Sequence, residues 1–83
     1  MKLLKWSYWR RNHIRAWFDL WPNSPVIFRR VRNYYFIYSA QWSKDDLPVP
    51  SNYFEKMELL LNRDLGLEQE YVRRKANKKE GPH

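Results

Sequence analysis

Fifteen aromatic side chains in a chain of only 83 residues are the strongest constraint on how this sequence can fold. A buried aromatic residue removes about 150–250 Å² from water, and a domain of this length buries only about 60% of its unfolded surface. The chain has no cysteine to form a disulfide, and its two histidines are too few to make a stabilising metal site expected. Some rings are therefore expected on the surface, where an aromatic patch normally marks a contact.

The aromatic residues share one half of the chain with most of the excess positive charge. Residues 1–44 contain 12 of the 15 rings, all five tryptophans and nine Lys or Arg, against a single carboxylate, Asp19. Residues 45–83 contain seven Lys or Arg and eight Asp or Glu. This asymmetry predicts contact with a polyanion, either a nucleic acid or an anionic phospholipid.

The spacing of apolar residues predicts an extended, all-α fold with little independent core. Apolar residues recur at steps of three and four over about residues 3–20 and again over 25–43. The β-branched and aromatic content of the second segment would also suit a strand. Helix is preferred there because strict alternation fails at Arg29-Arg30.

The second half of the chain predicts a linker and a helical tail. Residues 45–52 are rich in proline and charge, which favours an extended backbone. A polar helical segment is expected over about 53–77, interrupted near Gly66, with Asn52 and Glu55 resembling a capping box. The resulting organisation is two basic, aromatic docking helices in 1–44, a linker in 45–52, and a helical tail in 53–83 whose polar end, KKEGPH, is expected to be disordered.

Two sets of residues are the candidate binding groups, because Trp, Tyr and Arg anchor protein interfaces and Arg pairs with phosphates. The predicted interface anchors are Trp6, Trp9, Trp17, Phe18, Trp21, Tyr35, Tyr38 and Trp42. The predicted contacts to anionic lipid or phosphate are Arg10, Arg11, Arg15, Arg29, Arg30 and Arg32.

No residue pattern indicates catalysis, so a non-enzymatic protein without metal or cofactor is expected. The sequence has no glycine-rich phosphate loop, and its serines lack the context of a nucleophile. Asp45 and Asp46 are adjacent in the linker and are assigned to turn or capping roles. His13 has no second ligand at helical spacing and is assigned to packing.

The favoured function is that of a structural accessory subunit in a large mitochondrial inner-membrane complex of the respiratory-chain or ATP synthase type. The first 18 residues contain Arg, lack acids and fit an amphipathic helix, as mitochondrial targeting segments do. The longest uncharged run, residues 33–43, is too short for the ~20 residues of a membrane span, so a peripheral position is expected. There the chain would clamp neighbouring subunits of a hetero-oligomer and contact anionic phospholipid. The alternative is a small organellar ribosomal protein whose arginines bind rRNA.

Overall fold

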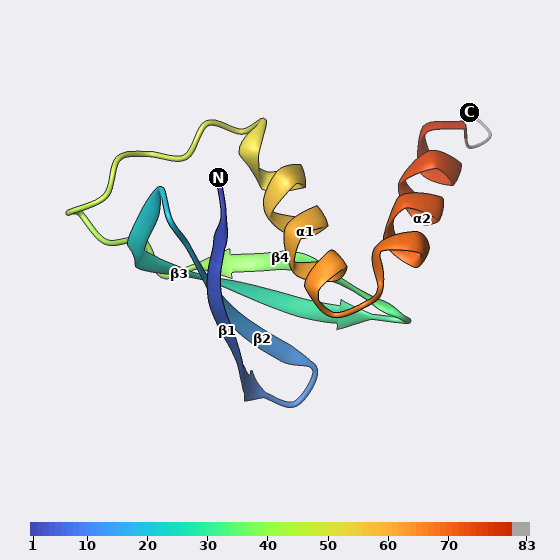
Figure 1. The fold of residues 1–83 in the computed structure, drawn as a ribbon, viewed down its shortest axis with the longest axis horizontal. Helices are drawn as coiled ribbons and strands as arrows, with labels where there is room; N and C mark the ends of the chain where they lie inside the picture. The colour runs from blue at the N-terminus through green and yellow to red at the C-terminus, as the bar shows by residue number, and fades with distance from the viewer. Residues whose placement is uncertain (81–83) are drawn as a thin grey trace.

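The protein, described by a computed structural model over residues 1–80, is an antiparallel sheet followed by two helices (Figure 1). The four strands lie side by side in chain order as a meander. The strands are β1 (Leu3–Arg10), β2 (His13–Phe18), β3 (Trp21–Val31) and β4 (Tyr34–Ala40), and the helices are α1 (Tyr53–Asp64) and α2 (Glu68–Glu80).

The predicted all-α fold is wrong, because each of the two predicted docking helices is instead part of the sheet. Residues 3–20 form the hairpin of β1 and β2, and residues 25–43 contain most of β3 and all of β4. Both hairpins turn through two residues, and Asn12 and Arg32 have positive φ values of 61° and 60°. The chain is therefore reversed at points where a continuous helix was expected.

Register shifts in the strands explain why the spacing of apolar residues resembles that of a helix. The pairing shifts between Leu3 and Lys5 in β1, so that Leu3 and Trp6 both pair with core residues at a spacing of three. A further shift accompanies Tyr38 in β4. One extra residue in a strand turns the period of two into a step of three, which resembles a helical pattern.

The helical tail predicted over about 53–77 corresponds to α1 and α2. Gly66 lies between them with a φ of 77°, the left-handed conformation that glycine adopts easily at a helix end. The capping box is absent, since Asn52 makes no side-chain hydrogen bond at the start of α1. Residues 78–80 of the tail belong to α2, and the rest of the predicted disordered end, residues 81–83, lies outside the described part of the chain.

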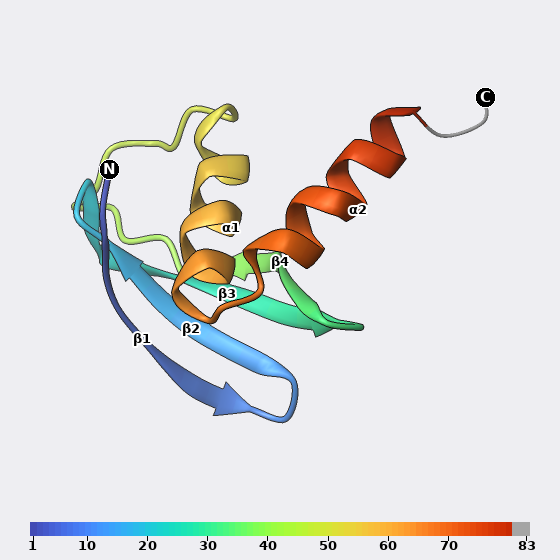
Figure 2. The ribbon, with the colours of Figure 1, turned by 45° about the vertical axis from the view of Figure 1, so that its right-hand side comes forward.

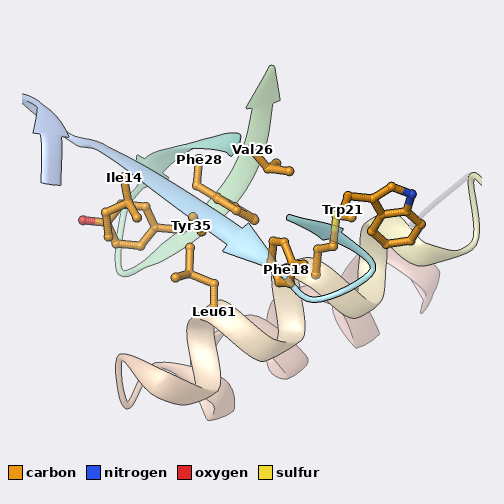
Figure 3. Packing of buried hydrophobic residues seen from close by; sticks show 9 residues of the cluster. Ile14, Phe18, Trp21, Val26, Phe28, Tyr35 and Leu61 are labelled. Carbon is orange, nitrogen blue, oxygen red and sulfur yellow. The ribbon is translucent and has the colours of Figure 1, made fainter. Parts of the chain in front are cut away.

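The prediction of little independent core is also wrong, because α1 packs on one face of the sheet and closes a core (Figures 2 and 3). The close-up in Figure 3 shows Leu61 of α1 pointing from the helix toward Tyr35 of the sheet. Burial of these side chains contributes about 1.5–3 kcal/mol each to folding. The buried cluster consists of Ile14, Ala16, Phe18, Trp21, Val26, Phe28, Tyr35, Met57 and Leu61.

The exposed backbone edge of β4 is covered by polar side chains from α1. The Asn62 side chain, fully buried, accepts a hydrogen bond from the Tyr35 N–H (2.8 Å) and donates one to the Tyr35 carbonyl (2.9 Å). Glu58 accepts a hydrogen bond from the Ile37 N–H (3.0 Å) and another from the Tyr71 hydroxyl (2.7 Å). These side chains take the place of a fifth strand, and they attach both helices to the sheet.

The linker is held against the sheet by Asp46. Its carboxylate accepts hydrogen bonds from the Ser24 hydroxyl (2.6 Å) and from the Asn23 N–H (3.0 Å). Ser24 is fully buried, and its hydroxyl also accepts a bond from the Ser43 N–H (2.9 Å). Asp46 thus fastens the first part of the linker to β3.

Replacing Asn62 should destabilise the protein strongly, because Asn62→Ala leaves the Tyr35 N–H and carbonyl buried without partners. The expected loss is about 2–4 kcal/mol in the free energy of unfolding, measured by urea denaturation. Asn52→Ala is the matched control, since Asn52 is exposed and makes no capping bond, and it should change stability by less than about 0.5 kcal/mol. Equal effects of the two substitutions would contradict the role given to Asn62.

The Tyr71–Glu58 pair should make stability fall at alkaline pH. Burial, followed by the hydrogen bond to Glu58, raises the pKa of Tyr71 far above its usual value. The pKa of Tyr71 in the folded state exceeds the unfolded value of about 10. The stabilisation that the neutral Tyr71 hydroxyl gives the folded state is therefore complete below pH 10 and is lost as pH rises further. Tyr71→Phe should therefore flatten the decline in unfolding free energy between about pH 10 and 11.5. The exposed Tyr38→Phe should retain the wild-type decline.

Candidate functional site: the open face of the sheet

The face of the sheet opposite α1 carries its own ordered set of side chains. In β2 the buried residues Ile14, Ala16 and Phe18 alternate with half-buried residues that point to the other side. Among residues 1–80 neither helix lies across that side, and α2 reaches only the β4 margin, where Tyr71 contacts Phe36 at 6.1 Å between ring centroids. The strand register places these pairs opposite one another on this face: Lys5 and Trp17, Ser7 and Arg15, Arg10 and His13, Arg29 and His13.

Cations lie over two of the tryptophan rings on this face. The Lys5 ammonium is 4.6 Å from the centre of the Trp17 ring, and the Arg15 guanidinium carbon is 5.2 Å from it. The Arg10 guanidinium carbon is 3.8 Å from the Trp9 ring. Each contact of this kind contributes about 0.5–1 kcal/mol at an exposed site. They hold the rings in fixed orientations without burying them completely.

His13 joins Trp9 to the neighbouring aromatic residue on β4. Its ring packs edge-on against Trp9 (6.2 Å between centroids) and against Tyr38 (5.2 Å). Nδ1 lies 2.7 Å from the Arg11 carbonyl, so the tautomer with a proton on Nδ1 donates a hydrogen bond there. The result is a row of three rings across the sheet, beside Arg10 and Arg29.

The name open face is used below for a set of eight residues from all four strands. It consists of Lys5, Trp9, Arg10, His13, Arg15, Trp17, Arg29 and Tyr38.

The open face is positively charged and has no acid within it. The only carboxylate between residues 3 and 40 is Asp19, which lies in the β2–β3 turn. The hydrogen bond from the Lys2 N–H (2.8 Å) lowers the pKa of Asp19 and engages its carboxylate in the turn, outside the open face. The potential over the face is therefore positive and attracts anions.

A buried apolar residue, Ile27, packs against one of the arginines of the open face. Ile27 is opposite Arg15 in the register yet only 1% exposed. The Arg15 Nε atom is itself buried, and no hydrogen-bond partner for it exists within the described residues. Arg15 therefore packs as part of the surface, and its stem helps to cover Ile27.

The structure divides the predicted interface anchors between the open face and the core. Trp9, Trp17 and Tyr38 lie on the open face. Phe18, Trp21 and Tyr35 are buried in the core, whereas Trp6 and Trp42 are partly buried and pack against it. The Trp6 indole also donates a hydrogen bond to Asp64 of α1 (2.6 Å), and Trp42 packs against Trp21.

The six predicted phosphate-contacting arginines are similarly divided. Arg10, Arg15 and Arg29 lie on the open face, and Arg11 lies in the β1–β2 turn. Arg30 pairs with Tyr35, on the side of the sheet that α1 covers, and Arg32 lies in the β3–β4 turn. Lys5 and His13 were not among the predicted binding residues. Alternation in β2 was the signal that could have placed His13 on this face, whereas Lys5 is placed there only by its pairing with Trp17 across β1 and β2.

A family model described as "Uncharacterised protein YuzH" matches residues 2–76, which includes the whole sheet and α1. The chain belongs to this family. No curated protein and no solved structure matches the chain in the comparisons made. The description of this family names no activity, so membership assigns none to the open face.

Two further properties of the described residues bear on the predicted classes. No helix within residues 1–80 is both long and apolar enough to cross a membrane. No group of three or more His, Cys, Asp or Glu in the described residues is arranged to hold a metal ion.

The assignment of Trp17 and Phe18 to opposite faces can be tested by truncating each. Phe18→Ala removes a fully buried ring and should cost about 3–5 kcal/mol in unfolding free energy. Trp17→Ala removes a larger side chain but should cost only about 1 kcal/mol, because Trp17 is half-buried and mainly loses contacts with Lys5 and Arg15. A cost for Trp17→Ala equal to that for Phe18→Ala would place both rings in the core.

Proposed function

We propose that this protein binds single-stranded nucleic acid on the open face and acts as a non-catalytic binding module. The observation that carries the proposal is the mixture of cations and aromatic rings on one uncovered sheet face without a carboxylate among them. Proteins that bind single strands combine a basic surface for phosphates with rings on which bases stack. Both groups are present here on four adjacent strands.

In this proposal the rings and the cations have separate roles. Trp9 and Trp17 stack with bases, and Tyr38 extends the aromatic row toward β4. Lys5, Arg10 and Arg29 neutralise phosphates along the strand. Stacking needs unpaired bases, because a duplex hides the base faces, so a single strand suits this surface better than a double helix. Stacking accepts every base, so little sequence preference is expected.

The distribution of exposed apolar residues favours this proposal over lipid binding. A membrane-binding surface needs apolar side chains gathered on one face beside the cations. The large exposed hydrophobic residues here are scattered over the strands, the linker and both helices. Of these, Tyr38 belongs to the open face, and Val31 lies on the same side of β3 as Arg29. The scattered residues are Leu4, Tyr8, Leu20, Val31, Tyr38, Leu47, Phe54 and Val72.

The role in a mitochondrial inner-membrane complex loses the part of its argument that relied on a targeting-like helix, because residues 3–20 form a hairpin and not an amphipathic helix. A place among the subunits of such a complex, contact with anionic phospholipid and a mitochondrial location stay predictions. The alternative of rRNA binding in a ribosome shares its chemistry with the present proposal, and the open face supports its RNA-binding part.

Fluorescence anisotropy with labelled 12-nucleotide RNA and DNA single strands tests the proposal. Wild type should bind at low salt and more weakly as salt increases. Trp9→Ala and Trp17→Ala should each weaken binding by about 1–3 kcal/mol, the value typical of base stacking. Phe54→Ala is the aromatic control, since Phe54 is exposed on α1, away from the open face, and should leave affinity unchanged.

The cations are tested by a matched pair of lysines that both lie over aromatic rings. Lys5 lies 4.6 Å from the Trp17 ring on the open face, and Lys56 lies 4.9 Å from the Tyr53 ring on α1. Lys5→Ala should reduce affinity and lower the salt slope by about 0.7, whereas Lys56→Ala should change neither. Absence of binding to both nucleic acids, together with binding to anionic vesicles, would overturn the proposal in favour of a lipid surface.

A further inference from the structure

A second basic site lies beyond the open face, between the β3–β4 turn and α2. A cavity of about 210 Å³ is lined by Arg32, Asn33 and Tyr34 from the turn and by Glu70, Arg73 and Arg74 from α2. Three arginines and one acidic residue, Glu70, thus line one small space. Glu70 is 3.6 Å from Arg73, and the described residues provide no ion pair for Arg32 or Arg74. The cavity has an excess of positive charge.

The backbone at Arg32 adds a second observation about this cavity. Arg32 has a φ of 60°, a conformation that glycine or asparagine adopts with less strain. Its carbonyl accepts a hydrogen bond from the Arg30 Nε atom (3.0 Å), which helps to hold the turn in this conformation. Strained backbone conformations are concentrated at functional sites, and Arg32, which has one, lines the cavity.

Aromatic residues connect the cavity to the open face. Arg29 of the open face is opposite Phe36 in the register of β3 and β4. The Phe36 ring packs edge-on against Tyr34, 4.8 Å away between centroids, and Tyr34 lines the cavity. These contacts place the cavity at the end of the sheet next to Arg29.

We infer that this cavity binds a phosphate group of the nucleic-acid strand that lies on the open face, an inference that rests on the proposed function. Guanidinium groups donate paired hydrogen bonds to phosphate oxygens, and three of them can surround one group from different sides. Glu70 holds Arg73 in position through their ion pair. The site therefore fixes the path of the strand beyond the stacked bases.

The length of the bound strand separates the two sites experimentally. A 4-nucleotide strand has room to occupy the open face alone, and a 12-nucleotide strand reaches the cavity as well. The double variant Arg73→Ala/Arg74→Ala should weaken binding of the 12-nucleotide RNA roughly 3- to 10-fold and lower its salt slope by about 0.7. It should leave binding of the 4-nucleotide strand unchanged. The control is Lys44→Ala/Lys56→Ala, which removes the same charge elsewhere and should show neither effect.

A second variant controls for the possibility that the double variant loses binding because it unfolds. Arg32→Gly suits the positive φ, so it should not lower the melting temperature, yet it should weaken binding of the 12-nucleotide strand only. Wild-type binding with equal salt slopes for the Arg73/Arg74 variant and the control would overturn the inference while leaving the proposed function intact. Failure of wild type to bind either strand would instead reject the proposed function, and the cavity's role with it.

Discussion

The pairing of the Asn62 amide with the backbone of Tyr35 is the interaction on which the rest of the structure depends. A strand at a sheet edge presents unpaired N–H and carbonyl groups, and burying them without partners is costly. Asn62 supplies one donor and one acceptor in the arrangement of a neighbouring strand, and Glu58 satisfies the next N–H along β4. This fixes the position of α1 over the sheet and thereby the position of Met57 and Leu61 in the core.

The two edges of the sheet are protected by different means, and the difference determines which surface stays free. At β1, register shifts on either side of the strand centre and the charged Lys5 and Arg10 discourage pairing with another strand. At β4, both helices are attached through Glu58, which binds Ile37 and Tyr71 together. With α1 over the core and α2 beside β4, no helix of residues 1–80 is left for the opposite face. That face remains open as a direct consequence of how the β4 edge is closed.

Sequence reasoning located the regular helices but not the sheet, for reasons that particular residues show. The segment from Tyr53 to Asp64 has a simple helical period and needs no distant partner to be recognised. In β1, by contrast, the shift after Leu3 places Trp6 with the core, while Lys5 and Trp17 share the other face. A helical period groups Trp6 with Trp17, so rings of the two faces were assigned to one surface. Composition alone predicted binding roles for arginines and tryptophans, but only strand register separates Trp9 and Trp17 from Phe18 and Trp21. Nothing local marks Asn62, whose partner is 27 positions away.

The cation–ring contacts on the open face bear on how a ligand could bind there. Arg10 lies over one face of the Trp9 ring at 3.8 Å, so in the proposed complex a base that stacks on that face displaces the guanidinium. The lost contact is worth about 0.5–1 kcal/mol, whereas stacking of a base on an aromatic side chain is worth about 1–3 kcal/mol. Under the proposed function this exchange is favourable overall, and it would release Arg10 to pair with a phosphate of the same strand. Without ligand, the cation keeps the ring ordered and covered. The same cation–ring contacts that order the side chains of the open face would thus preorganise the rings and the cations for the proposed ligand.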